Sequence, residues 1–222
     1  MKEAYRHLTA AAEAKETAIG RLAEIIAILR VECPWDRVQT HESLRAGMLE
    51  EAYEVVEAID NKDLANLREE LGDVLLQVVF HAHIEEERGG FDLTDVINEE
   101  CEKMIRRHPH VFLEESENNH AKSIDKVLEK WENIKVQERG DQRVTSRMEK
   151  VPKALPALTR ANKIQKRAAE SGFDWDDISG AFDKVKEEYR EVISCCQDEN
   201  KDAARLKEEV GDLLFSVVNI SR

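Results

Sequence analysis

The chain has 222 residues, of which 33 are basic and 47 acidic, and its formal net charge is −14. This charge argues against a nucleic-acid polymer or an anionic membrane surface as partner, because both would repel the protein. With 36% charged residues but only four prolines and nine glycines, the composition favours an all-α protein that is large enough to bury a core.

The cysteines and the apolar runs indicate the compartment. The four cysteines form no Cys-x-x-Cys pair and no framework typical of secreted domains, which favours a reduced setting. The N-terminus lacks the apolar core of a signal peptide. The longest apolar run, 74–80, is too short to cross a bilayer. We therefore expect a cytoplasmic protein with no membrane partner.

Several helices follow one another along the chain. A first helix ends before Pro34, since proline cannot continue a helix. A second helix starts near Thr40 or Ser43, and its apolar stripe is expected to face the core; the stripe consists of Leu49, Tyr53, Val56 and Ile59. Further helices are expected at about 63–86, 93–107 and 124–138. The second half of the 63–86 helix is apolar nearly all round, which predicts burial, in small helical proteins often at a subunit interface.

An acidic motif spans the second and third of these helices. Glu50-Glu51-x-x-Glu54 is followed by fifteen residues and then by Glu70-x-x-Asp73. Residues three and four apart share a helix face, and the polar residues 60–63 can turn the chain back, so five carboxylates should meet across an antiparallel helix pair. Such crowding raises the pKa values of carboxyl groups, and hard divalent cations with oxygen ligands relieve it. The motif therefore predicts a magnesium site.

The motif recurs near the end of the chain. Glu187-Glu188-x-x-Glu191 is followed by seventeen residues and then by Glu209-x-x-Asp212, and segment 210–218 aligns with 71–79. The offset between the copies is 137 residues for the first element and 139 for the second. A period this long indicates duplicated domains and not a solenoid. Because the chain stops soon after the second motif, we expect the second copy to be cut short.

These features resemble the MazG family, the nucleoside triphosphate pyrophosphohydrolases of the all-α NTP pyrophosphatase superfamily. The EExxE–spacer–ExxD signature is present twice, and the segments that also match are CPWDRVQT at 33–40, RRHPHVF at 106–112, LPAL at 155–158, KIQKR at 163–167 and GFDW at 172–175. The resemblance implies a MazG-type helical bundle, here duplicated, that forms a homodimer through apolar helices. The segments expected are an N-terminal helical extension (1–20), a first MazG domain (21–138), a linker (139–156) and an incomplete second MazG domain (157–222).

The resemblance also implies the reaction. Family members hydrolyse nucleoside triphosphates to a nucleoside monophosphate and pyrophosphate with Mg²⁺, and we expect Mn²⁺ as an alternative ion. Water is expected to attack the alpha phosphate. In two-domain members the C-terminal copy is understood to be the active one. Matching the motifs assigns the metal ligands to Glu51, Glu54, Glu70 and Asp73 in the first copy and to Glu188, Glu191, Glu209 and Asp212 in the second.

Substrate contacts follow from the same matching. Lys184 and Arg205 are the expected cations of the second copy, where the first copy has Gly47 and Asn66. The residues that resemble further substrate contacts in the first copy are Lys103, Arg107 and Trp131, and the corresponding part of the second copy lies beyond Arg222. As a hypothesis, Glu50 and Glu187, at the edge of each acidic arc, orient or deprotonate the attacking water.

Other interpretations were weighed against this one. A ferritin-like di-iron bundle needs Glu-x-x-His on two helices, and the single match, Glu117 with His120, excludes it. A catalytically silent helical interaction or regulatory domain stays open, because the second copy is expected to be cut short. The pairs His81/His83 and His108/His110 are expected to be structural, since residues two apart point about 200° apart on a helix. Trp35 and Trp175 are expected to be core or loop anchors and not platforms for a base. The preferred nucleotide and the active copy are left open.

Overall fold

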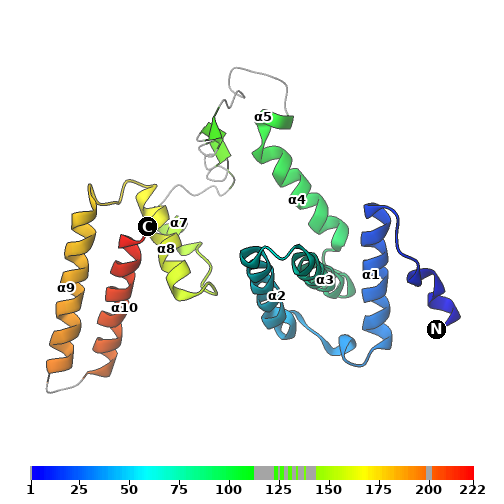
Figure 1. The fold of residues 1–222 in the computed structure, drawn as a ribbon, viewed down its shortest axis with the longest axis horizontal. Helices are drawn as coiled ribbons and strands as arrows, with labels where there is room; N and C mark the ends of the chain where they lie inside the picture. Colours follow the sequence, from blue (N-terminus) through cyan, green and yellow to red (C-terminus); the bar gives the residue numbers. More distant parts are fainter. Residues whose placement is uncertain are drawn as a thin grey trace. The chain divides into compact units, whose positions relative to one another are not determined.

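The computed structural model describes residues 2–112, 123–124, 126–127, 130–131, 134, 138, 144–198 and 202–222. The chain divides into two compact units, Met1–His120 and Ala121–Arg222. Every regular element in the described residues is an α-helix or a 3-10 helix, as Figure 1 shows. The all-α prediction is confirmed. No helix in these residues has both the length and the apolar character needed to cross a bilayer.

The first unit contains a helical hairpin with one helix packed against it. Its elements are η1 (Glu3–Thr9), α1 (Lys15–Glu32), η2 (Asp36–Val38), α2 (His41–Asn61), α3 (Leu64–Glu87), α4 (Leu93–Arg107) and α5 (Pro109–Phe112). The side chain of Thr40 accepts a hydrogen bond from the backbone N–H of Ser43 and starts α2, and Asp63 caps α3 in the same way. Lys62, with φ of 57°, turns the chain between them. The predicted antiparallel pair is therefore present.

The core of this unit lies where α1 crosses the hairpin. Ile26, Leu44, Val79, Phe80 and Ile84 form one buried cluster. α1 and α2 thus cover part of the apolar second half of α3 within the unit, whereas Leu75 is 42% exposed.

Arg30 fastens α1 to this core. Its guanidinium bonds Glu87 at 3.0 and 2.5 Å, donates to the carbonyl oxygens of Asp36 and Gln39 at 2.6 and 2.9 Å, and lies 5.7 Å from the ring centre of Phe80. One side chain therefore holds α1, the turn after Pro34 and α3 together.

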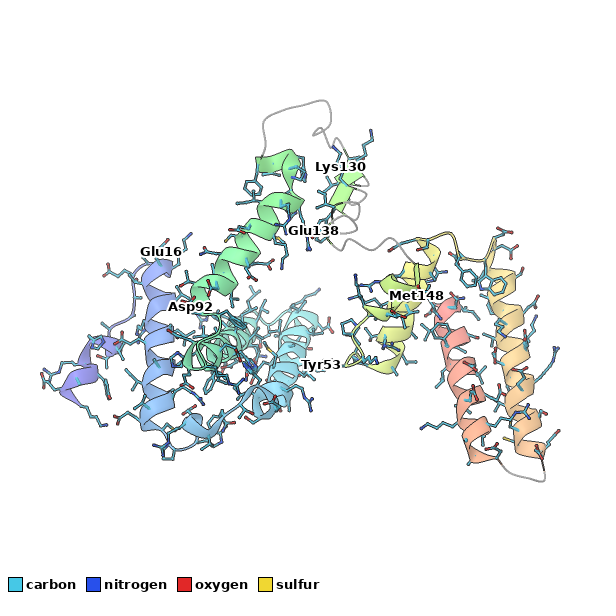
Figure 2. All side chains as sticks on the ribbon, turned by 180° about the vertical axis from the view of Figure 1, so that it is seen from behind. Glu16, Tyr53, Asp92, Lys130, Glu138 and Met148 are labelled. Carbon is cyan, nitrogen blue, oxygen red and sulfur yellow. The ribbon has the colours of Figure 1, made fainter. Side chains whose placement is uncertain are left out.

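The expectation that the α2 stripe faces the core is wrong for this unit. The four residues are between 51% and 61% exposed, and Tyr53 is labelled in Figure 2. The physical reason is that α2 packs mainly against α3, so the buried face of α2 is the one that carries Leu44 and Ala58. Trp35, expected to be an anchor, is 62% exposed.

The second unit repeats the hairpin. Its elements are α7 (Val144–Glu149), α8 (Ala157–Ala169), α9 (Ile178–Gln197) and α10 (Ala203–Ile220). Asp177 and Asp202 accept hydrogen bonds from the first backbone N–H groups of α9 and α10. Figure 1 shows α9 and α10 side by side, and α8 packs against α10.

The predicted segment boundaries stay proposals. α1 runs through residue 20 without a break. The helix expected at 124–138 is described only in part, and the start of the expected linker, 139–143, lies outside the described residues, as do Glu117 and His120.

Candidate active site

The first acidic cluster joins the middle of α2 to the first half of α3. One carboxylate oxygen from each of Glu51, Glu70 and Asp73 lies within 4.8 Å of the others. Glu54 interacts with the same group, because it hydrogen-bonds to Glu51 and its charge acts on Glu70. The hairpin therefore brings together the four carboxylates that the motif predicts as ligands in the first copy.

Burial and the crowding of carboxylates raise the pKa values of two of these groups. Burial raises the pKa of Glu51 most, followed by its hydrogen bond to Glu54 and by the charge of Asp73. Burial also raises the pKa of Glu70, and the negative charges of Glu54 and Asp73 add to the effect. The cluster thus holds more negative charge than its surroundings compensate. Oxygen donors with excess negative charge fit a hard divalent cation.

α9 and α10 form a second cluster of the same design. One carboxylate oxygen from each of Glu188, Glu209 and Asp212 lies within 4.8 Å of the others, and Glu188 is only 4% exposed. Burial and the charges of Glu209 and Glu188 raise the pKa of Glu191, which places this residue in the same group. The motif therefore gathers its four carboxylates in both copies.

The copies differ in the cations beside the carboxylates. The Lys184 Nζ lies 2.6 Å from Glu188 and 3.0 Å from Glu187, and hydrogen bonds to both raise the pKa of Lys184 above its usual range. The Arg205 Nε lies 3.6 Å from a carboxylate oxygen of Glu209. In the first copy, Gly47 occupies the place of Lys184, and Gln77 lies against it: a Cβ on Gly47 would be 3.0 Å from the Gln77 Nε2.

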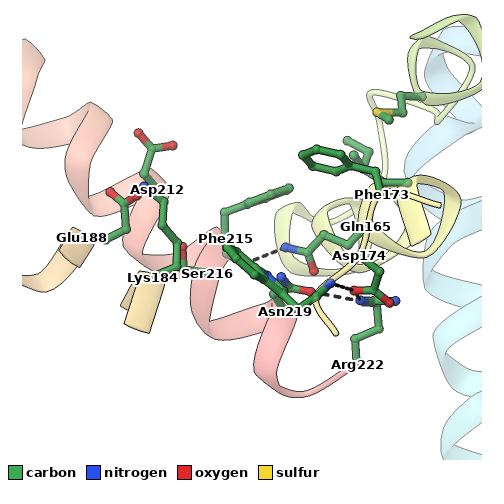
Figure 3. Close-up of a pocket in the computed structure, with 14 residues that line it drawn as sticks. Gln165, Phe173, Asp174, Lys184, Glu188, Asp212, Phe215, Ser216, Asn219 and Arg222 are labelled. Atoms are coloured by element: carbon green, nitrogen blue, oxygen red, sulfur yellow. Dashed lines mark hydrogen bonds and ion pairs between the residues drawn. The ribbon is translucent and has the colours of Figure 1, made fainter. Parts of the chain in front are cut away.

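A cavity of about 730 Å³ opens beside the second cluster. Lys184, Glu188 and Asp212 line one end, as Figure 3 shows. The other lining residues include Gln165 of α8, Phe173 and Trp175 of the loop before α9, and Phe215, Asn219 and Arg222 at the end of the chain. Its volume is within the range of small-molecule sites. The carboxylates therefore lie at the edge of a partly aromatic cavity.

The comparisons with known proteins fit this arrangement. The family profile "MazG nucleotide pyrophosphohydrolase domain" matches residues 39–112. The nucleoside triphosphate pyrophosphohydrolase/pyrophosphatase MazG of Thermotoga maritima is 50% identical over 190 residues, which are 86% of this chain and 69% of that protein. This chain belongs to the MazG family.

One further relative covers the chain to a similar extent, and one solved structure covers about half of it. The nucleoside triphosphate pyrophosphohydrolase of Escherichia coli K12 is 45% identical over 207 residues, which are 92% of this chain and 77% of that protein. A crystal structure of a mazG-related protein from Thermotoga maritima aligns with a TM-score of 0.45 and 34% identity, over 52% of this chain and 97% of that one.

The remaining residues that the MazG resemblance singled out are not among the carboxylates that lie within 4.8 Å of one another. Glu50 and Glu187 are exposed. Lys103 pairs with Glu100 on α4 and lines a separate cavity of about 490 Å³. Arg107 ends α4, and Trp131 belongs to the second unit. Their roles in substrate binding stay predictions.

The sequence analysis did not predict several residues that line the cavity. Gln165 and Phe173 lie in the KIQKR and GFDW segments, which marked the family match but carried no assigned role. Trp175, expected to be an anchor, is 49% exposed and lines the cavity. The aromatic residues of GFDW beside an acidic motif were the one signal that could have indicated this cavity.

His41 and His81 form a pair across the hairpin, whereas the rings of His108 and His110 lie 5.8 Å apart between residues close in the sequence. The Nδ1 atoms of His41 and His81 are 2.7 Å apart, and the rings are stacked. The Nε2 of His41 is 2.7 Å from Glu85, whereas His83 contacts Glu86. As expected, His81 and His83 do not share a site.

Proposed function

We propose that this chain hydrolyses nucleoside triphosphates to a nucleoside monophosphate and pyrophosphate. The observation that carries the proposal is the second acidic cluster, which combines four carboxylates, two cations and an adjoining cavity. Membership in the MazG family supports it, since relatives with 45–50% identity are named for this activity. We further propose that the enzyme acts in the cytoplasm.

The ion we propose is Mg²⁺, with Mn²⁺ as an alternative. Glu188, Glu191, Glu209 and Asp212 would hold it in the second copy, and Glu51, Glu54, Glu70 and Asp73 in the first. Carboxylates on two paired helices supply the hard oxygen ligands that Mg²⁺ prefers. When bound, Mg²⁺ neutralises phosphate charge and helps to orient an in-line displacement.

The protein's cations would hold the phosphates. Lys184 and Arg205 now pair with Glu188 and Glu209. A divalent ion that takes over these carboxylates would release both side chains toward the beta and gamma phosphates. Glu187 is exposed and next in sequence to Glu188, so it can accept a proton from the attacking water and pass it to solvent; Glu50 has the same place in the first copy.

The hairpin of the first copy has no cation at the places of Lys184 and Arg205. Gly47 and Asn66 replace Lys184 and Arg205, so the cations proposed there are Lys103 and Arg107 of α4. We therefore propose that the second copy is the more active one.

A homodimer is the proposed assembly. The stripe of Leu49, Tyr53, Val56 and Ile59 on α2 is 51–61% exposed. The second hairpin exposes a similar set, namely Tyr189, Ile193, Leu214 and Val217, at 38–57%. Exposed apolar surface on this scale is typical of interaction sites.

The test is release of pyrophosphate from mixed nucleoside triphosphates with Mg²⁺. The double substitution Glu51→Gln and Glu188→Gln removes one ligand from each copy and should reduce turnover at least about 100-fold. The matched control, Glu57→Gln with Glu208→Gln, changes one exposed glutamate in each of the same two hairpins and should leave turnover unchanged.

Each single substitution then identifies the active copy. Full activity in the double variant would overturn the metal assignment. Binding of nucleotide without any pyrophosphate release would favour the alternative, a catalytically silent interaction domain.

A further inference from the structure

The cavity of the second unit follows one face of α10 away from the carboxylates. Asp212, Ser216 and Asn219 line it, and their spacing of four and three residues places them on one side of the helix. At 1.5 Å per residue, the lined face extends over about 10 Å. A ligand whose phosphates lie at Glu188 and Asp212 would therefore have its nucleoside part beside Gln165 of α8 and Phe173 of the following loop, both labelled in Figure 3.

Among the residues that line the cavity, Gln165 is unusual because its buried polar side chain has an oxygen without a hydrogen-bond partner among the described residues. It is 6% exposed and one of three buried polar or charged residues in the described part of the chain. Its Nε2 donates to the backbone carbonyl oxygen of Phe215 at 2.7 Å. Its Oε1 is buried and has no hydrogen-bond partner among the described residues.

The orientation of this carboxamide is fixed by chemistry. The carbonyl of Phe215 can only accept a hydrogen bond, so the amide nitrogen of Gln165 has to face it. The Oε1 then points away from the Phe215 carbonyl, as Figure 3 shows. A buried acceptor without a donor is unfavourable, and a native protein keeps one where a ligand or another group satisfies it.

We propose that Gln165 is a specificity-determining residue: its Oε1 accepts a hydrogen bond from an N–H group on the edge of the nucleobase. The proposal rests on the proposed function, because the phosphates have to bind at the second acidic cluster. Phe173, Trp175 and Phe215 supply the aromatic surface against which a planar base can pack.

The chemistry of the bond predicts which ligands are rejected. Adenine and cytosine offer an exocyclic amino group, and guanine and uracil offer a ring N–H. A base that lacks the donor leaves Oε1 buried and unpartnered, so it binds more weakly. The hydrogen bond is remote from the phosphorus under attack, so its loss should raise KM and leave kcat nearly unchanged.

The experiment compares paired substrates that differ in one donor. The pairs are ATP with purine riboside triphosphate, UTP with N3-methyl-UTP, and GTP with N1-methyl-GTP. In the unmodified protein, we expect kcat/KM to differ at least about tenfold within one or more pairs. In Gln165→Met, which keeps the length of the side chain but loses the acceptor, that ratio should fall to about one. Gln197→Met, at an exposed position, is the matched control and should keep the ratio.

The outcomes separate this role from a structural one. Gln165 also ties α8 to α10 through Phe215; if that were its whole role, Gln165→Met would lower kcat/KM equally for both members of every pair. An unchanged ratio, or no discrimination by the unmodified protein, overturns the proposal.

Failure of the proposed function would look different. If no nucleoside triphosphate releases pyrophosphate, the same pairs as alpha,beta-methylene analogues are titrated with Mg²⁺ by calorimetry. If the Kd values of the two members of a pair differ at least about tenfold, and Gln165→Met removes this difference, the role of Gln165 would still be supported. Equal Kd values within every pair would overturn it.

Discussion

The Lys184 Nζ lies 2.6 Å from a carboxylate oxygen of Glu188, and the first copy of the motif has Gly47 where Lys184 stands. The pair gives the second cluster an internal cation that the first cluster lacks. Burial, and after it the neighbouring carboxylate charges, raise the pKa values of Glu51 and Glu70 in the first cluster. Two sites with the same ligands therefore differ in electrostatics.

The first prediction exchanges this cation. Lys184→Met should reduce nucleotide turnover about 10- to 100-fold, mainly through KM, because a phosphate contact is lost. Lys186→Met, on the same helix and exposed, serves as control. Steady-state kinetics with Mg²⁺ measures both. Equal activity of the Lys184 variant and the control would contradict the role of Lys184.

The reverse exchange should strengthen the first site. A lysine at position 47 needs the space of Gln77, since a Cβ there would lie 3.0 Å from the Gln77 Nε2. Gly47→Lys with Gln77→Ser copies both residues of the second site, Lys184 and Ser216. In a background where Glu188→Gln has disabled the second site, we expect Gly47→Lys with Gln77→Ser to raise the residual turnover several-fold. Gln77→Ser alone should leave the residual turnover unchanged.

The second prediction concerns pH in the absence of metal. The pKa of Glu51 in the folded protein is raised above its ordinary value of 4.5, so the folded state binds this proton more tightly than the unfolded state. Its contribution to stability is present at low pH and is lost as the pH rises through the raised pKa. The melting temperature should therefore increase as the pH falls from 7 toward about 5.

Below about pH 5 the melting temperature should stop rising, because other carboxyl groups have lowered pKa values in the folded protein. Hydrogen bonds from Arg30 and His41 lower the pKa values of Glu87 and Glu85. Their contribution is lost only as the pH falls below their ordinary value of 4.5. Glu51→Gln should raise the metal-free melting temperature at pH 7 and reduce the stabilisation by Mg²⁺. A flat profile in the original protein would contradict the crowding of the cluster.

The third prediction concerns Arg30. Its side chain is 8% exposed and pairs with Glu87. Arg30→Met leaves Glu87 and two backbone carbonyls without their donor, which should cost about 3 kcal/mol. Urea unfolding measures the loss, and hydrogen exchange should locate it in α1 and α3. Lys15→Met, at an exposed position on α1, is the control; a loss no larger than that of the control would show that Arg30 does not hold α1.

Local signals in the sequence account for much of the fold and for the acidic clusters. Caps such as Thr40 and Asp63 define where α2 and α3 begin, and carboxylates three and four apart have to share a helix face. Once the hairpin closes, both ligand groups follow.

Contacts between distant residues could not be predicted in this way. The pairing of His41 with His81 joins residues forty apart in sequence. Helical spacing likewise shows that Tyr53 belongs to an apolar stripe, but not whether a helix of the same chain covers it. The unpartnered Oε1 of Gln165 depends on the position of Phe215, which lies in another helix.

The last prediction concerns the contact between Trp175 and Gly180. A Cβ at position 180 would lie 2.4 Å from the Trp175 Cε3 and 2.9 Å from its Cδ2, so the indole packs directly on the backbone of α9. Gly180→Ala should push the ring away from its place in the cavity wall. Because alanine favours a helix by about 1 kcal/mol over glycine, and because Trp175 is half exposed, the overall stability should hardly change.

Substrate binding should change nonetheless. We expect KM to rise several-fold while kcat stays within about twofold, since the ring is remote from the phosphates. Fluorine NMR of protein labelled with 5-fluorotryptophan should show one of the three tryptophan signals shifted. Gly20→Ala, where a Cβ meets nothing within 4 Å, should shift none. An unmoved Trp175 signal, or a loss of kcat equal to the rise in KM, would contradict the positioning of the aromatic wall by Gly180.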